Sequence, residues 1–433
     1  MSCCTGTKIR MQRVVFFSLL ISFLFFFFNY IEVSILFYLG LAWLLLSVIA
    51  LSEKEMFLMI SFLMPNLFMF KWIGAETAIL GYFFVLVGIK SIIKKYKHSV
   101  KVNLFLFLHI CSVFLTCVLY MDTSLLTSLV RFVANFSLFS YYATLFSRNG
   151  EIKLAVKMYC AGIIIAILMG MVFYSAEGIL YGGYFGGVNI GRNYFGAVVT
   201  PTITIVMMYI LEKNISFREI LLYGITLVLC MISVVLSLSR TSMLSFLLPA
   251  LMCFLYILRS VRKFNKRLIP LLLLFSVIAI WVLTNYEDMV ARILKRFEQD
   301  DLQTGNGRFV LWQFYLKRMA RSPVSFLLGS GSALMYDAAE HNTIVQSLHQ
   351  VGALGSVTLL CVLKQSFRRI TEDVQIRFLS IFPLLSIIFP YCGINALYTD
   401  QLSYLLVLSA LIMKDFSKTE LTAEVNCSAG SLV

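Results

Sequence analysis

The sequence has 433 residues, of which 60% are hydrophobic and only 13% charged, and its formal net charge is +14. Soluble domains carry nearer a quarter of charged residues, so this composition excludes an ordinary soluble domain. In a soluble protein the basic excess would suggest nucleic acid as a partner. Here the positive-inside bias of membrane proteins accounts for most of it, and no nucleic-acid partner is predicted.

Apolar runs long enough to cross a bilayer recur along the whole chain. The first, Val14 to Tyr30, lacks a small-residue cleavage site and is interpreted as a retained span rather than a signal peptide. The candidate spans are 14–31, 33–51, 55–70, 76–93, 102–120, 125–146, 154–175, 194–211, 217–238, 241–258, 268–284, 342–363, 378–395 and 397–413. The sequence therefore predicts one all-α polytopic bundle, residues 1–433, with about 12–14 spans, of which the third and the last two are the least regular.

The distribution of basic residues predicts the orientation of these spans. Most of the 36 Lys and Arg residues fall in the segments that a cytoplasmic N-terminus would place inside. The positive-inside rule therefore predicts that both termini are cytoplasmic. The same alternation places the loop 176–193, the turn at 239–241 and the large loop 285–341 together on the outer side, with Arg131 in the outer part of its span.

The large loop is the longest stretch that no bilayer would accept, and it carries seven Lys or Arg residues. Apolar residues recur at helical spacing over 289–297 and again over 309–319, which predicts two amphipathic helices with basic polar faces. The glycines at 305–307 separate the two helices, and Pro323 is expected to end the second. The sequence Gly-Ser-Gly at 329–331 predicts a flexible joint before the chain re-enters the membrane at His341.

Arg240 is the most distinctive single residue, because it stands within an otherwise unbroken apolar tract. A charge there costs a few kcal/mol unless it faces a partner or a polar cavity. The alternative is an arginine that extends to the interface from a tight turn. Since the predicted orientation directs Arg240 to the same side as the large loop, we favour a functional role.

Arg308 and His341 lie at the beginning and at the end of the second half of the large loop. Guanidinium groups bind phosphate oxygens through two parallel hydrogen bonds, so Arg240 and Arg308 together could hold a pyrophosphate. Alternatively, Arg308 is a solvated loop residue. An imidazole at position 341 could accept a proton from a sugar hydroxyl near neutral pH, or serve only as a polar helix cap. His349 is about 12 Å further along the helix and is interpreted as a core residue.

The smaller loop is rich in glycine and contains Arg192 as its one basic residue. Such a segment either brings backbone close to a ligand or is simply a turn. The ten cysteines lack metal-site spacing, and no phosphate-binding glycine loop with Lys-Ser/Thr is present. We therefore predict neither a metal nor another cofactor. Without nucleotide, the reaction needs an activated donor delivered through the membrane, and a lipid diphosphate fits because its leaving group is already good.

Three motifs resemble those of the bacterial O-antigen ligase and O-antigen polymerase superfamily. They are SLSRTSMLSF (237–246), GRFVLWQFYLKRMARSPVSFLLGSGS (307–332) and HNTIVQSLHQVGALG (341–355). The segment VNIGRNYFGA (188–197) is similar to an asparagine-containing outer-loop motif of these proteins. About a dozen spans are usual in this superfamily, so the fourteen candidate spans depart from its pattern, and the N-terminal third matches it only as a hydrophobic profile.

The resemblance implies glycosyl transfer from an undecaprenyl-diphosphate-linked saccharide on the outer face of the cytoplasmic membrane. It implies that Arg240 and Arg308 hold the pyrophosphate and that His341 activates or orients the acceptor hydroxyl. The residues expected to bind substrate are Arg192, Asn193, Arg131, Arg318 and Asn342. Membrane lipid is a further expected partner, together with a chain-length regulator and a flippase.

Within the superfamily, a polymerase transfers the glycan to another lipid-linked repeat unit, whereas a ligase transfers it to the lipid A core. We favour the polymerase because polymerases are the more diverse group. A lipid-linked oligosaccharide flippase or another transporter is the more distant alternative. Transporters are commonly built from internal repeats, and the single large loop makes the two halves of this chain unequal.

Overall fold

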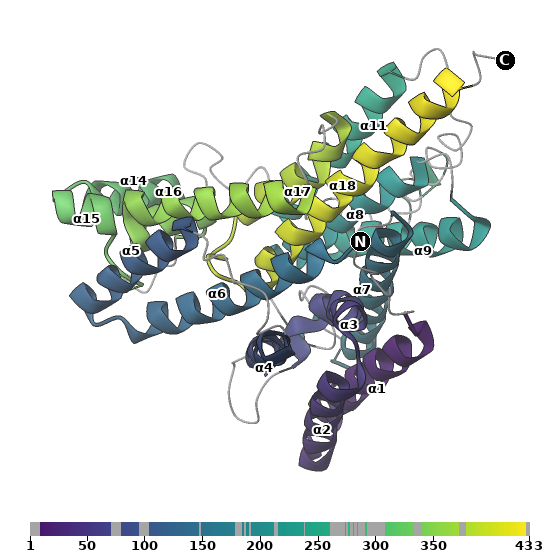
Figure 1. Cartoon of the computed structure of the whole chain (residues 1–433), viewed down its shortest axis with the longest axis horizontal. Coiled ribbons are helices and arrows are strands. Elements are labelled where there is room, and N and C mark those ends of the chain that lie inside the picture. Colours follow the sequence, from purple (N-terminus) through teal and green to yellow (C-terminus); the bar gives the residue numbers. More distant parts are fainter. Residues whose placement is uncertain are drawn as a thin grey trace.

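The computed structural model of the protein consists of helices that pack into one bundle (Figure 1). It describes residues 9–70, 79–94, 104–146, 149–177, 184–185, 188–189, 192–211, 215–237, 239–259, 308–332, 340–371 and 378–429, and isolated residues between 273 and 291. The predicted all-α polytopic class is confirmed.

The described part of the chain up to residue 177 contains seven α-helices and one 3₁₀ helix. They are α1 (Met11–Ile31), α2 (Ser34–Ala50), α3 (Glu53–Leu63), η1 (Met64–Met69), α4 (Ile79–Lys94), α5 (Leu104–Tyr120), α6 (Thr123–Thr144) and α7 (Asn149–Glu177). Within the predicted small outer loop, the short strands β1 (Tyr184–Phe185) and β2 (Val188–Asn189) pair antiparallel, with Phe185 opposite Val188.

The C-terminal half continues the helical pattern. Its described elements are α8 (Arg192–Leu211), α9 (Phe217–Ser237), α10 (Arg240–Ser245), α11 (Leu247–Arg259), α14 (Arg308–Met319), α15 (Pro323–Leu328), α16 (Thr343–Thr371), η2 (Phe378–Ile381), α17 (Phe382–Tyr391) and α18 (Asp400–Ala429). The predicted span 268–284 and the first amphipathic helix, 289–297, lie almost entirely outside the described residues.

Ten apolar helical segments coincide with predicted spans. Five of them are long enough to cross a membrane: Met11–Ile31, Gly150–Val172, Asn193–Leu211, Phe217–Val234 and Thr343–Thr371. The shorter ones are Ser34–Ala50, Ile79–Lys90, Leu104–Tyr120, Thr241–Tyr256 and Phe382–Tyr391. The predicted span 55–70 is instead divided, because the α-helical turns of α3 give way to η1 at the position of Pro65.

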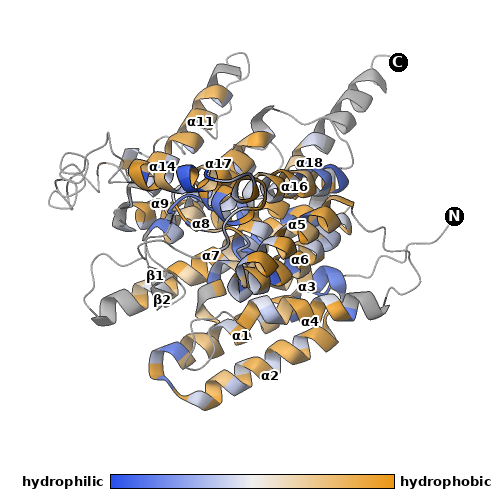
Figure 2. Ribbon diagram, turned by 90° about the vertical axis from the view of Figure 1, so that its left-hand side faces the viewer, coloured by the Kyte–Doolittle hydropathy of each residue, from blue (hydrophilic) through white to orange (hydrophobic). Residues whose placement is uncertain are grey.

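The outer surface of the bundle is apolar, as a lipid-facing surface must be. Figure 2 shows hydrophobic residues over most of α1, α2, α4 and α11. Many of these side chains point outward: Ile49 on α2 is 79% exposed and Leu104 on α5 is 64% exposed. This exposure over many helices supports a multi-pass membrane protein.

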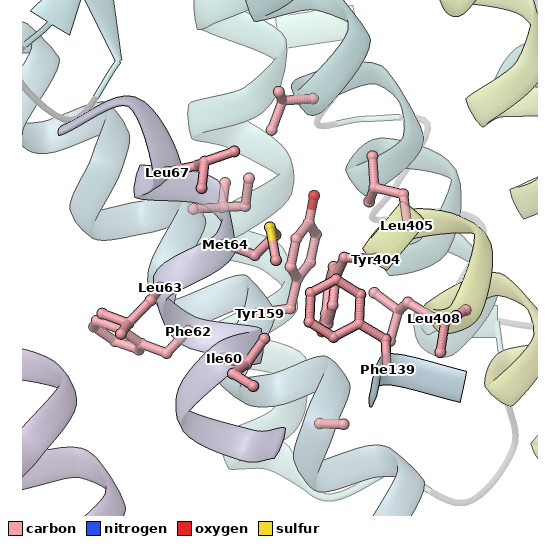
Figure 3. Close-up of a cluster of buried hydrophobic side chains, with 14 of the residues drawn as sticks. Ile60, Phe62, Leu63, Met64, Leu67, Phe139, Tyr159, Tyr404, Leu405 and Leu408 are labelled. Carbon is pink, nitrogen blue, oxygen red and sulfur yellow. The ribbon is translucent and has the colours of Figure 1, made fainter. Parts of the chain in front are cut away.

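Aromatic side chains and small residues form the interior contacts. In Figure 3 the rings of Tyr159 on α7 and Tyr404 on α18 lie side by side, with centroids 5.9 Å apart, and Phe139 on α6 meets Tyr404 edge-on. A Cβ on Gly162 of α7 would lie 2.1 Å from the backbone oxygen of Phe62, so α3 and α7 approach closely only because this residue is glycine.

The described part of the large loop lies against α16. Figure 1 shows α14 and α15 beside the first half of α16, close to the turn between α5 and α6. The predicted helix over 309–319 is confirmed as α14. The prediction that Pro323 ends this helix is wrong: α14 ends at Met319, and Pro323 is the first residue of α15, where its missing N–H is not needed.

The prediction of a flexible joint at 329–331 is also wrong, because the backbone of this segment is hydrogen-bonded to α16. The N–H of Ser330 donates to the carbonyl of His349 at 2.7 Å, and that of Gly331 donates to the carbonyl of Gln350 at 3.2 Å. Gly329 and Gly331 have φ of 82° and 75°, which glycine adopts without steric cost. Asp122, in the α5–α6 turn, accepts hydrogen bonds from the backbone and the hydroxyl of Ser332. This part of the loop is therefore anchored on two sides.

Candidate functional site

The first part of the site is the break between α9 and α10. Ser239 caps the N-terminus of α10, since its hydroxyl accepts from the N–H of Ser242 at 3.3 Å. The same hydroxyl donates to Oδ1 of Asn193, at the start of α8, at 3.0 Å. A capped helix start therefore stands where the sequence predicted a tight turn, and it directly contacts a candidate substrate-binding residue.

Arg240 is the first residue of α10. Its backbone is described, but its side chain, like that of Arg192, lies outside the described part of the structure. The neighbouring backbone is tightly packed: a Cβ on Gly196 of α8 would lie 1.7 Å from Oγ of Ser242, and one on Gly393 would lie 2.7 Å from Cγ2 of Thr241. α8, α10 and the end of α17 therefore fix the position from which the Arg240 side chain extends. Its phosphate-binding role remains a prediction.

The second part of the site centres on Glu340, whose side chain is fully buried. Its Oε1 accepts from Nδ1 of His349 at 3.0 Å and from Nε2 of Gln350 at 3.4 Å, and its Oε2 accepts from Nδ2 of Asn395 at 2.7 Å. Its backbone carbonyl accepts from Nε1 of Trp312 at 2.8 Å. We call these five residues the Glu340 junction. It joins α14, the start of α16 and the connection between α17 and α18.

His341 directly follows Glu340, and its side chain is exposed. Its φ of 51° places it in the left-handed region, which costs a residue with a Cβ about 1–2 kcal/mol. Such strain persists only where the surrounding contacts impose it, and it is characteristic of functional sites. The exposed imidazole therefore stands on a strained turn beside a buried carboxylate.

Asn342 caps the N-terminus of α16, and its substrate-binding role remains a prediction. Its Oδ1 accepts from the N–H groups of Ile344 and Val345 at 2.9 and 3.1 Å, and its own N–H donates to Oδ1 of Asn395 at 3.2 Å. The helix-capping role that was the alternative for His341 is therefore performed by Asn342. Because Asn342 supplies the cap, the imidazole of His341 is not needed for that purpose.

Arg308 lies close enough to His341 to affect its protonation. Arg308 begins α14 and is one helical turn before Trp312, whose indole bonds to the carbonyl of Glu340. Partial burial lowers the pKa of His341, the positive charge of Arg308 lowers it further, and Glu340 opposes them. The imidazole is therefore neutral near neutral pH and has a free lone pair to accept a proton.

The carboxylate of Glu340 remains ionised despite its burial. Burial by itself raises the pKa of Glu340, but the hydrogen bonds from His349 and Asn395 outweigh it, so the net shift is downward. The side chain is therefore a fixed negative charge next to the exposed imidazole. The prediction that His349 is a core residue is confirmed: it is 1% exposed, and its ring packs 4.5 Å from that of Tyr315.

The two parts of the site meet at Asn395. Tyr194, the residue after Asn193, donates its hydroxyl to the backbone carbonyl of Asn395. Asn395 in turn bonds to both Glu340 and Asn342. The structure thus gathers the start of α8, the start of α10 and the His341 turn at one end of the bundle. The sequence predicted that these segments lie on one side of the membrane.

Arg131 is placed apart from this group by its contacts. It forms an ion pair with Asp400, Nε to Oδ2, at 3.6 Å, and Asp400 also accepts from Nδ2 of Asn135 at 2.7 Å. A Cβ on Gly81 would lie 2.8 Å from both members of the pair. The pair therefore joins α4, α6 and α18 within the bundle, and the substrate-binding role of Arg131 remains a prediction.

Arg318 is in the last turn of α14, on the same helix as Arg308. One of its terminal nitrogens, Nη1, is buried and makes no hydrogen bond within the described part of the chain. That leaves a donor available in a partly buried position beside the loop. Within the same described part, no three His, Cys, Asp or Glu side chains gather at metal-binding distance.

Reasoning from the sequence missed Glu340 and Asn395. The signal for Glu340 was its position directly before His341, where a buried acid next to an imidazole affects both orientation and charge. For Asn395 no local signal existed, because the residue lies in an apolar segment far along the chain and reaches Glu340 only through the fold.

Residues 225–360 match a family model described as O-antigen ligase. The matched segment includes Arg240, Arg308, Glu340 and His341, and it covers all three of the motifs that carried the resemblance. The resemblance is therefore confirmed over this segment, and because members of the family are glycosyltransferase-like ligases and polymerases, the match supports an enzyme role. No curated protein sequence matches the chain.

Proposed function

Because residues 225–360 match the O-antigen ligase family model and carry its motifs, we propose that the chain is a surface-polysaccharide polymerase. It would transfer an undecaprenyl-diphosphate-linked glycan to another lipid-linked repeat unit on the outer face of the bacterial cytoplasmic membrane. The observation that carries this proposal is that α14, which begins at Arg308, bonds through Trp312 to the carbonyl of Glu340, the residue before His341, within the matched segment. A cation and a neutral imidazole at one point suit phosphate binding and proton removal.

In the proposed reaction, the acceptor hydroxyl oxygen attacks the anomeric carbon of the donor sugar. The bond between that carbon and the diphosphate oxygen breaks, and the hydroxyl proton passes to His341. Undecaprenyl diphosphate leaves with the bonding electrons, and Arg240 and Arg308 stabilise the charge that develops on it. Planar guanidinium groups match two phosphate oxygens at once, which a lysine cannot do.

The lowered pKa of His341 supports its role as the base. Positioned proton transfer contributes roughly 10²–10⁴-fold to a rate. His341→Ala should therefore reduce transfer by about that factor while donor binding is retained. His341→Gly suits the left-handed φ of this position, and free imidazole should restore part of its activity. If His341→Ala transfers glycan at the wild-type rate, the assignment of the base is wrong.

The ligase, with lipid A core as acceptor, uses the same donor chemistry and is the alternative. The glycan profile of a deletion strain separates the two activities. Loss of a polymerase leaves single repeat units on the lipid A core, whereas loss of a ligase leaves bare core. Normal chains in a strain without a second homologue would contradict both, and lipid-linked units retained on the inner face alone would indicate the flippase.

The proposal places both termini in the cytoplasm and the site outside. Supporting it, segments predicted to be outer contact one another in the structure, as Asn193 and Ser239 do. Reporter fusions at Asn265 and Gly307 should report opposite compartments. A cytoplasmic signal at Gly307 would contradict the orientation.

A chain-length regulator and a flippase are the proposed protein partners, because the donor must cross the membrane and polymer growth must stop.

A further inference from the structure

The Glu340 junction does more than hold helices together, because it fixes the peptide groups on both sides of His341. On one side, the carbonyl of Glu340 accepts from the indole of Trp312. On the other, the N–H of Asn342 donates to Oδ1 of Asn395, whose Nδ2 donates to the carboxylate of Glu340. His341 is thereby held in a left-handed conformation by contacts from three separate elements.

The burial of Glu340 calls for a reason beyond stability. An ionised carboxylate in the interior is costly, and apolar packing often stabilises a protein as well or better. Here the carboxylate is completely buried, yet its oxygens are satisfied by three neutral or titratable donors and by no lysine or arginine among the described side chains. A buried negative charge without a permanent counter-ion therefore stands one residue from the exposed imidazole.

We propose that Glu340 is a positioning residue for His341: its carboxylate, held by Asn395 and His349, sets the strained turn that presents the imidazole beside Arg308. This inference rests on the proposed function, in which His341 accepts the proton. The charge of Glu340 has a second consequence, because it favours the protonated imidazolium that forms during transfer. Glu340 does not touch the substrate in this assignment.

The geometric and electrostatic contributions of Glu340 can be separated by experiment. The charged groups that face His341 are Arg308 from α14, Glu340 before it, and His349 from α16 through Glu340. Glu340→Gln keeps the shape and an acceptor oxygen but removes the charge. Glu340→Asp keeps the charge but shortens the side chain. Asn395→Ala keeps the charge and removes the contacts that hold both peptides.

The experiment measures the pH dependence of transfer by the purified full-length protein with an undecaprenyl-diphosphate saccharide. The rate rises with pH as His341 loses its proton. Glu340 raises the pKa of His341, so Glu340→Gln should lower that pKa and shift the rising limb to lower pH. We also expect the plateau kcat to fall about tenfold or more with little change in the donor KM, since positioning acts on the chemical step.

The other two variants test the geometric part. Glu340→Asp and Asn395→Ala should both lose kcat, while the rising limb remains nearer to the wild-type position than in Glu340→Gln. They also keep the proposal testable if Glu340→Gln does not fold. Glu151→Gln, which removes a distant ion-paired carboxylate on α7, is the matched control and should keep the wild-type profile.

Two results would overturn the proposal. One is a folded Glu340→Gln protein with wild-type kcat. The other is a Glu340→Gln protein whose transfer rate is reduced by the same factor at every pH, so that the rising limb stays at the wild-type pH. Failure of the proposed function is distinguishable from both, because it would appear as full activity in His341→Ala whatever Glu340 does. If the acceptor is lipid A core rather than a repeat unit, the pH dependence of transfer is measured with that acceptor, and the expected results are the same.

Discussion

The two ends of the bundle are held together by different chemistry. α9 begins near Glu219, which pairs with Lys157, and ends beside Ser239, which bonds to Asn193. We call the end with Glu219, and with the pair of Lys54 and Glu151, the ion-pair end. The end with Asn193, Ser239 and the Glu340 junction is the site end. The two ion pairs of the first end join long, partly exposed charged side chains, with Glu55 as a buried carboxylate beside Lys54. Short, buried polar groups meet at the second end.

The difference explains which end can support catalysis. Ion pairs of flexible, partly exposed side chains are screened by solvent and tolerate changes in geometry. Hydrogen bonds among buried amides and a carboxylate are stronger and have little geometric freedom. The site end can therefore hold an imidazole in a strained turn, whereas the ion-pair end only closes the bundle.

Replacing Asp400 by Asn should have the largest effect on stability. Asp400 is 2% exposed and carries the counter-charge of Arg131. Breaking a fully buried pair costs about 3–5 kcal/mol, and because the side chain of Arg131 is 26% exposed and partly solvated, the cost here should lie at the lower end, about 3 kcal/mol. Thermal unfolding in detergent should show a large fall in Tm, and the double variant Asp400→Asn with Arg131→Met should recover part of it. A wild-type Tm in Asp400→Asn would mean that this pair contributes no more than a surface pair.

Gly196→Ala should cause the next largest loss of stability, because it forces α8 away from α10. The new Cβ would lie 1.7 Å from Oγ and 3.2 Å from Cα of Ser242, so the backbone must move. Overpacking of this kind costs about 1–3 kcal/mol. It should also reduce transfer activity by displacing the start of α10, where Arg240 stands. Thermal unfolding and the transfer assay measure the two effects.

Gly224→Ala on α9 is the matched control, since nothing lies within 4 Å of its added Cβ. A helix gains about 0.5–1 kcal/mol from replacing glycine by alanine where there is room. The two substitutions should therefore change Tm in opposite directions. Equal effects would show that close contact between α8 and α10 is unimportant.

Asp122→Ala should have a moderate effect at the site end. Asp122 caps α6 through the N–H of Leu125 and anchors Ser332. Loss of the cap alone costs about 1 kcal/mol. Loss of the anchor should expose the segment after α15 to protease, which limited proteolysis would detect. Asp122→Asn keeps Oδ1 for the N–H of Leu125 and the hydroxyl of Ser332 but loses the acceptor for the N–H of Ser332, so its effect should fall between wild type and Asp122→Ala. Equal protease sensitivity in wild type and Asp122→Ala would contradict the anchoring.

The same carboxylate predicts a dependence on pH. Burial raises the pKa of Asp122, but hydrogen bonds from Leu125 and Ser332 outweigh it and hold the pKa below its ordinary value. A group with a lowered pKa in the folded state stabilises fully above its unfolded pKa and loses that contribution as pH falls through the folded value. The wild type should therefore lose more stability than Asp122→Ala on acidification below pH ~4, measured as Tm against pH.

Much of the fold was predictable, because lipid imposes simple rules on sequence. Apolar length located ten of the helical segments, and α14 followed from helical spacing over 309–319. The interruption before Arg240 was also predictable, since serines on both sides offer the caps that a broken helix needs. These features depend on residues close together in the chain, which is why local patterns contain them.

What sequence reasoning missed depends on contacts between distant segments. Pro323 was expected to end a helix, but proline fits equally well at the first position of a new one, and local sequence does not distinguish the two. Gly329 and Gly331 were expected to be flexible, but α16 bonds to the backbone beside them. Asn395 became recognisable only when the fold placed it against Glu340.

Glu151→Gln should have the smallest effect, and it compares the two ends of the bundle directly. The carboxylate of Glu151 lies 2.7 Å from Nζ of Lys54, and both side chains are about one-fifth exposed. Exposed and partly exposed pairs contribute about 0.2–1 kcal/mol, and less at high salt. Tm should therefore fall by only a few degrees and transfer activity should stay within about twofold of wild type. Glu340→Gln makes the same chemical change at the site end, where we expect a loss of tenfold or more. Similar losses in the two variants would mean that net charge matters rather than position, and the contrast between the ends would fail.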